Sequence, residues 1–157
     1  MEDKLLVANK ICDIMLENSL DLVVESGLGT PLSIVRDRLE KTPAITHIGC
    51  FHPVYSIGMA AGASIGGMLP VVSIDEAGMV ESIAAIHEAV RTRKAAMLIL
   101  ATIPYTSNTS QAMESVLRSF DLDWFHANDA VDYLTYFRDG VRLLKEEGHT
   151  RIIFINE

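Results

Sequence analysis

Apolar residues along the chain follow two alternating patterns, helical spacing and short continuous runs. Over residues 1–18 they recur every three or four positions, which predicts an amphipathic helix. Further helices are expected at 31–39, 53–67, 79–91, 110–120 and 129–147. Strands are expected at 21–26, 44–50, 70–75 and 151–157, with a short strand or loop at 123–129. The apolar run at 95–104 fits a buried strand in a sheet that is covered on both faces.

Capping residues sharpen several of these boundaries. Thr30 is expected to cap the second helix, with Pro31 at its first position. Asp129 and Asp132 form a capping pair for the last helix, which should end at Gly148. Because strands and helices alternate from end to end, the sequence predicts an α/β, doubly wound domain. Its mainly parallel sheet should have about six strands, with helices on both faces.

Composition and charge narrow the functional classes. The chain has 157 residues, of which 49% are hydrophobic and 22% are charged, as expected of one globular domain. Its net charge of -8 argues against a nucleic-acid-binding surface. The basic residues Arg36 and Arg38 lie near a helix end and are expected to be solvated.

Two further features of the sequence favour a cytoplasmic protein. The longest apolar runs, such as 95–103, are too short to span a membrane, and the chain begins with acidic residues rather than a basic leader. Its two cysteines, Cys12 and Cys50, lack the spacing of a zinc motif and are expected to be buried thiols.

In a parallel sheet, ligands bind beyond the carboxyl ends of the strands. This rule points to the loops at 26–30, 50–54, 75–79 and 103–109. The sequence SGLGT at 26–30 matches neither nucleotide-binding glycine motif, so it either makes a tight turn or offers backbone N–H groups to a small anion. The polar residues 107–110 either bind a substrate acid group or form a plain turn and helix cap.

The helix expected at 53–67 is rich in glycine, alanine and serine. Each glycine in a helix interior costs about 1 kcal/mol relative to alanine, so close packing must offset the cost. The helix either crosses its own sheet tightly or packs against a second subunit, and the two interpretations are compatible.

Three segments carry a family resemblance: DLVVESGLGTPLSIVRDRLE, ITHIGCFHPVYSIGMAAGASIGGMLPVVSIDEAGMVESIAAIHEAV and AAMLILATIP. In this order they resemble the pyrimidine-binding (Pyr) domain of thiamine diphosphate enzymes. The chain is most similar to the small α subunits of sulfopyruvate decarboxylase and to the matching domain of phosphonopyruvate decarboxylase. The resemblance covers nearly the whole chain and therefore implies a single Pyr-type domain over residues 1–157.

The resemblance implies thiamine diphosphate as cofactor and a small 2-oxo acid as substrate. The implied cofactor-binding residues are Ser26, Gly27, Pro53, Asp75 and Gly78. The chain lacks the Gly-Asp-Gly sequence with which the family binds the diphosphate and its metal. A separate diphosphate-binding subunit is therefore expected to hold Mg²⁺, and the small-residue helix is expected to support subunit association.

Pro53 departs from the family pattern. The family places a glutamate, which activates the cofactor, seven residues before the first Ala of Ala-Ala-Gly, and counting back from Ala60 reaches Pro53. Either activation is arranged differently, or catalysis has been lost, or the register differs by one residue. His52, as a proton shuttle, and Glu76 or Asp75, as the acid, are the ionisable groups placed to substitute.

Each substitute also has a simpler interpretation. His52 can be an ordinary loop residue, and the two carboxylates can cap the next helix. Three functional hypotheses follow: a Pyr subunit that decarboxylates a small 2-oxo acid or transfers its two-carbon unit, a non-catalytic regulatory or scaffolding homologue, and a small-anion-binding domain at 26–30.

Overall fold

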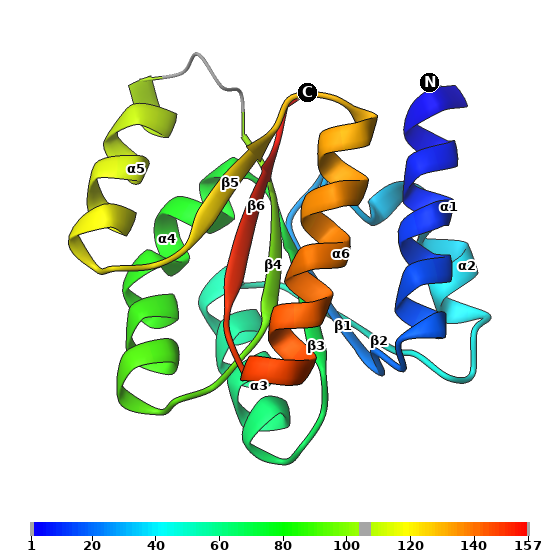
Figure 1. Cartoon of the computed structure of the whole chain (residues 1–157), viewed down its shortest axis with the longest axis horizontal. Helices are drawn as coiled ribbons and strands as arrows, with labels where there is room; N and C mark the ends of the chain where they lie inside the picture. Colours follow the sequence, from blue (N-terminus) through cyan, green and yellow to red (C-terminus); the bar gives the residue numbers. More distant parts are fainter. Residues whose placement is uncertain (1, 104–107, 157) are drawn as a thin grey trace.

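A six-stranded parallel sheet organises the chain (Figure 1). The computed structural model describes residues 2–103 and 108–156. Its strands are β1 (Leu22–Ser26), β2 (Thr46–Cys50), β3 (Pro70–Ile74), β4 (Leu98–Thr102), β5 (Trp124–Ala127) and β6 (Arg151–Ile155). They lie in the order β2-β1-β3-β4-β6-β5, and every pair is parallel. The predicted α/β doubly wound fold is therefore confirmed.

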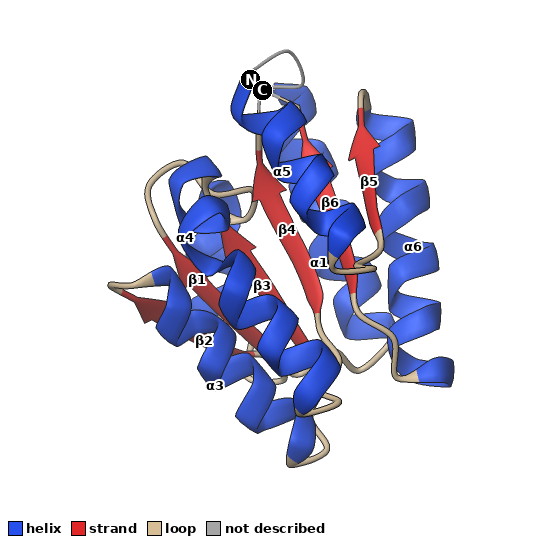
Figure 2. Ribbon diagram, turned by 90° about the vertical axis from the view of Figure 1, so that its left-hand side faces the viewer, coloured by secondary structure: helices blue, strands red, loops and turns tan. Residues whose placement is uncertain are grey.

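Helices cover both faces of this sheet. They are α1 (Glu2–Glu17), α2 (Arg36–Glu40), α3 (Pro53–Ile65), α4 (Glu76–His87), α5 (Asn108–Ser119) and α6 (Ala130–Glu147), with a 3₁₀ turn η1 (Ser33–Val35) and a π-helical turn η2 (Glu88–Thr92). Figures 1 and 2 show α1, α2 and α6 on one face and α3, α4 and α5 on the other. No helix within the described residues combines the length and apolarity that crossing a membrane requires.

The hydrophobic core is divided by the sheet into two parts. One part lies under α1 and α6 and includes Met15, Leu100 and Phe137, whereas the other lies under α3, α4 and α5 and includes Ile57 and Ile99. Strands β1, β3 and β4 are buried along their whole length. Burial on both faces explains the long apolar run around β4.

The predicted limits of the last helix are confirmed, whereas the predicted start of the second helix is wrong. Asp129 caps α6 by accepting hydrogen bonds from two backbone N–H groups, and Gly148 ends the helix with a φ of +59°. The helix predicted to begin at Pro31 instead starts as the 3₁₀ turn at Ser33. Thr30 does not cap it: the residue before the turn is Leu32, and the Thr30 hydroxyl donates to the buried carboxylate of Glu25 at 2.7 Å.

The two cysteines differ in burial. Cys12 is buried as expected, whereas Cys50 is only half-buried, because β2 is an edge strand, and both are free thiols.

The order in which the strands are added to the sheet reverses at β1, and this reversal creates a candidate site. Strand β2 lies on one side of β1 and β3 on the other, with Ser26 in register with both Cys50 and Ile74. The loops that follow these three strands therefore meet at the same end of the sheet, where ligands bind in doubly wound folds.

Candidate functional site

Asp75 connects the loops that follow β1 and β3 through hydrogen bonds. It is the N-cap of α4, and its Oδ1 accepts a hydrogen bond from the backbone N–H of Gly78 at 2.8 Å. Its Oδ2 accepts a second bond from the N–H of Leu28 at 3.2 Å. One carboxylate thus fixes the β1 loop against the start of α4.

Two glycines make this close approach possible. A Cβ on Gly27 would lie 2.3 Å from Asp75 Oδ2, and Gly27 has a φ of +108° that other residues rarely adopt. A Cβ on Gly78 would lie 3.0 Å from Asp75 Oδ1 and 3.2 Å from Pro53 Cβ. The fold therefore brings together four of the residues that the sequence singled out, Gly27, Pro53, Asp75 and Gly78.

Ser26 is the last residue of β1 and lies beside this group. It is 2% exposed, and its hydroxyl has no hydrogen-bond partner within the described part of the chain. Buried hydroxyls are nearly always paired, so an unpaired one at the end of a strand suits a polar ligand group.

Pro53 opens α3 at a position where its missing N–H costs no helix hydrogen bond. The residue is buried, and its carbonyl accepts from the Ser56 hydroxyl at 2.6 Å. The sequence contains no Asp or Glu between Glu40 and Asp75, so a shift of register by one residue supplies no carboxylate here. The start of α3 thus presents an apolar surface to Gly78.

His52 caps α3 and lies on the outer side of the site. Its Nδ1 accepts from the N–H of Val54 at 3.3 Å, and its ring packs against Tyr55 with centroids 5.2 Å apart. Half of the side chain is exposed, and Nε2 lies 3.9 Å from Glu81 Oε2. Glu76 is half-buried in the first turn of α4.

A buried carboxylate network that sequence analysis did not predict lies beneath the β1 loop. Glu25 is 2% exposed and accepts from Arg36 Nη2 at 2.6 Å and from the Thr30 hydroxyl at 2.7 Å, with His47 Nε2 at 3.0 Å. Burial raises the pKa of Glu25, but hydrogen bonds from Arg36, Thr30 and His47 outweigh it and lower the pKa below its ordinary value.

Arg36 is therefore more than a solvated helix-end residue, because it binds this carboxylate. The sequence signal for the network is the single Glu within the apolar run LVVES.

The outer surface of α3 is apolar and rich in glycine. Beyond the backbone of its own helix, a Cβ on Gly58 or Gly62 would meet no described atom within 4 Å, so contacts among the described residues require neither glycine. The exposed large apolar side chains here are Phe51, Tyr55, Met59 and Ile65, with Val80 on the neighbouring helix α4. We refer to these seven residues as the α3 surface.

The described residues contain no group of three or more His, Cys, Asp or Glu side chains arranged to hold a metal ion. Of the polar residues expected at 107–110, Ser107 lies outside the described residues, and the other three form the start of α5.

The fold and site define a class of protein: a doubly wound parallel α/β domain with a glycine-lined site at its strand ends. No protein-family profile and no curated protein matches the chain. Among solved structures, it is similar to 2-oxoglutarate:ferredoxin oxidoreductase from Magnetococcus marinus with 2-oxoglutarate, coenzyme A and succinyl-CoA bound, at a TM-score of 0.71 and 12% identity. The match covers 94% of this chain and 28% of that enzyme's chain, and at this identity it shows a shared fold.

Proposed function

We propose that the chain is the Pyr subunit of a two-component thiamine diphosphate enzyme acting on a small 2-oxo acid. The observation that carries the proposal is the meeting of Ser26, Gly27, Pro53, Asp75 and Gly78, the residues implied by the Pyr-domain resemblance. The structurally similar oxidoreductase is bound to 2-oxoglutarate, itself a 2-oxo acid, which supports the substrate class.

The site fits a cofactor ring in part. The Ser26 hydroxyl has no partner among the described residues, and Gly27 and Gly78 let the backbone approach closely. Bound thiamine diphosphate supplies a carbon nucleophile for the keto group and an electron sink. The chain's own residues orient the ring and exclude water, and His52 and Glu76 are the proposed proton carriers.

The carboxylate of Asp75 is a weaker proposal for this proton transfer. Both of its oxygens already accept backbone hydrogen bonds, from Gly78 and Leu28. Moving a proton onto either oxygen would weaken the contact that holds the β1 loop against α4.

The diphosphate and Mg²⁺ are proposed to be held by a separate subunit. The matched region is 28% of the similar enzyme's chain, which leaves most of such an enzyme to be supplied by other segments or subunits. Carboxylate and carbonyl oxygens are the ligands that Mg²⁺ prefers, and the partner would provide them.

The α3 surface is the proposed contact with that subunit, or with a second copy of the chain. Gly58 and Gly62 each cost about 1 kcal/mol in a helix interior, and no close packing between them and the other described elements offsets this cost. Glycines let another backbone approach, and the exposed Phe51 and Tyr55 beside them would become buried on association.

Pro53 favours a second candidate, a non-catalytic regulatory or scaffolding homologue. Its side chain is apolar and closely packed by Gly78, so the start of α3 supplies no acid for cofactor activation. Such a protein would keep the fold and the subunit contact without turnover.

Calorimetric titration of thiamine diphosphate with Mg²⁺ tests the proposal. The chain is titrated alone and mixed with the product of any adjacent gene that encodes Gly-Asp-Gly. Binding that is tighter in the mixture than in either subunit alone, followed by consumption of a 2-oxo acid, supports the enzyme subunit. Tighter binding without turnover supports the non-catalytic homologue, and no gain over the partner alone contradicts both.

A matched pair of variants tests the contact surface. Gly62→Leu adds a large side chain to the α3 surface, whereas Ala112→Leu adds one to an exposed position of α5. We expect only Gly62→Leu to weaken complex formation in analytical ultracentrifugation. Equal effects of the two variants would remove α3 from the interface.

A further inference from the structure

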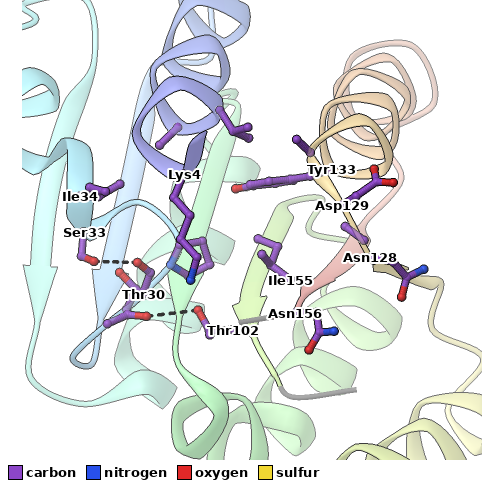
Figure 3. A pocket seen from close by; sticks show the side chains of 16 residues that line it. Lys4, Thr30, Ser33, Ile34, Thr102, Asn128, Asp129, Tyr133, Ile155 and Asn156 are labelled. Carbon is purple, nitrogen blue, oxygen red and sulfur yellow. Dashed lines mark hydrogen bonds between the residues drawn. The ribbon is translucent and has the colours of Figure 1, made fainter. Parts of the chain in front are cut away.

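A cavity of about 400 Å³ lies at the carboxyl ends of the strands, between α1 and α6 (Figure 3). It is lined by α1, the loop that follows β1, the start of α6 and the ends of β4, β5 and β6. Its apolar walls come from Val7, Ala8, Ile34, Ala127, Ala130 and Ile155. The volume and apolar walls are typical of cavities that bind small molecules.

Tyr133 lines this cavity and carries an unpaired, almost fully buried hydroxyl at its wall. The residue is 7% exposed, and its hydroxyl makes no hydrogen bond with any described residue. Figure 3 shows its ring reaching from α6 into the cavity. A buried hydroxyl without a partner costs about 1–3 kcal/mol, which is a reason to expect a ligand acceptor there.

The Tyr133 hydroxyl stays protonated near neutral pH and can therefore donate a hydrogen bond. Burial is the main cause that raises the pKa of Tyr133 above its ordinary value, and a smaller contribution comes from Cys12. The proton therefore stays on the oxygen, ready to be donated to a ligand.

The charges around the cavity favour an anionic ligand group. Lys4 extends from α1 along the cavity, is exposed, and forms no ion pair with a described residue (Figure 3). Asp129 is the acidic lining residue, but its Oδ1 already accepts from the N–H groups of Val131 and Asp132, both at 2.8 Å. The lysine charge is thus available to a ligand, whereas the aspartate charge is used to cap α6.

We propose that this cavity binds a small monocarboxylate with an aliphatic or aromatic body. The carboxylate accepts the hydrogen bond of Tyr133 and is attracted by Lys4, and the apolar body packs against Ala8 and Ile155. This site is separate from the proposed cofactor site and needs neither thiamine diphosphate nor a partner subunit.

The test is a titration of the full chain, labelled with ¹⁵N, with 4-methylpentanoate and with 3-phenylpropanoate. We expect saturable shifts of the amide signals of Ala8, Ala130 and Tyr133. The neutral probe 4-methylpentanamide should bind about tenfold more weakly, because it lacks the charge that strengthens both polar contacts. Absence of saturable shifts with both acids, or equal affinity for the amide, would overturn the proposal.

Tyr133→Phe removes the donor and keeps the ring. We expect about tenfold weaker binding of 4-methylpentanoate, as for loss of one charge-assisted hydrogen bond. The melting temperature without ligand should stay the same or rise, because an unpaired buried hydroxyl is removed. A lower melting temperature with unchanged affinity would identify a purely structural hydroxyl and reject the site.

Two further variants complete the comparison. Tyr136→Phe removes a hydroxyl from the same helix outside the cavity lining and should leave the affinity unchanged. Lys4→Met should weaken binding and reduce its dependence on salt. An equal loss of affinity in the Tyr136 and Tyr133 variants would contradict the assignment.

Discussion

Replacing Glu25 by glutamine removes a negative charge from the buried end of β1 and nearly preserves the side-chain shape. The carboxylate accepts from Arg36 and Thr30 at 2.6 and 2.7 Å, and His47 Nε2 lies 3.0 Å away. Glutamine keeps one oxygen acceptor but introduces N–H donors toward groups that also donate. We therefore expect Glu25→Gln to destabilise the fold.

The expected loss is about 2 kcal/mol of unfolding free energy at neutral pH. A hydrogen bond to a charged group contributes about 1.5–3 kcal/mol. The Arg36 side chain is 47% exposed, so water partly replaces its lost partner and its share must be reduced. His47 and Thr30 are buried and have no such compensation.

The pH dependence separates charge from shape. Because the pKa of Glu25 is lower in the folded state, its contribution is fully present above the unfolded pKa, near 4.3. It is lost as the pH falls through the folded pKa, where the carboxylate becomes protonated. The difference between the natural chain and Glu25→Gln should therefore be large at neutral pH and shrink below about pH 4.

Urea denaturation followed by circular dichroism measures this difference at each pH. Glu40→Gln is the control, because Glu40 Oε1 lies 3.8 Å from His47 Nδ1 but its side chain is 57% exposed. The control should change stability by less than about 0.5 kcal/mol. A loss in Glu25→Gln that is the same at neutral and acid pH would refute the electrostatic explanation.

Two further substitutions test contacts elsewhere. Gly27→Ala should cost about 2 kcal/mol or more in urea denaturation, because its Cβ would overlap Asp75 and its φ is positive. Gly29→Ala should cost only about 1 kcal/mol, since its φ is also positive but its surroundings are open, and an equal loss would contradict the steric explanation. Arg151→Met should lower the unfolding free energy by about 2–3 kcal/mol. The Arg151 side chain is only 8% exposed, and its guanidinium binds the carboxylates of Asp123 and Asp139. An unchanged denaturation midpoint for Arg151→Met would show that this ion pair adds no net stability.

The fold could be predicted from sequence patterns because a sheet that is buried on both faces contains apolar strand sequences. Strand β4 is buried along its entire length and lies within the apolar run at 95–104. Local capping chemistry also identified α6, whose N-cap Asp129 and terminal Gly148 occupy the predicted positions. The sequence rule for strand ends then directed attention to the loops where Gly27 and Asp75 meet.

Contacts between distant elements were not predictable in the same way. Thr30 has the sequence context of a helix cap, but its hydroxyl donates a hydrogen bond to Glu25. The buried carboxylate of Glu25 needs such donors. The pairing of Glu25 with His47 depends on the neighbouring placement of β1 and β2, which local patterns do not specify. The cavity around Tyr133 likewise needs α1 and α6 to lie beside the β1 loop.

The loop from Gly27 to Thr30 illustrates why glycine content alone did not decide between a turn and an anion site. Its backbone is held by the chain itself: the N–H of Leu28 donates to Asp75, and the carbonyl of Gly29 accepts from the Thr102 hydroxyl. The negative charge of Glu25 lies directly beneath Thr30. An anion there would face a buried carboxylate and find the Leu28 donor already used, so these contacts favour the turn. The loop thus contacts Asp75 of the candidate functional site through Leu28, and its residues Gly29 and Thr30 line the cavity that Tyr133 also lines.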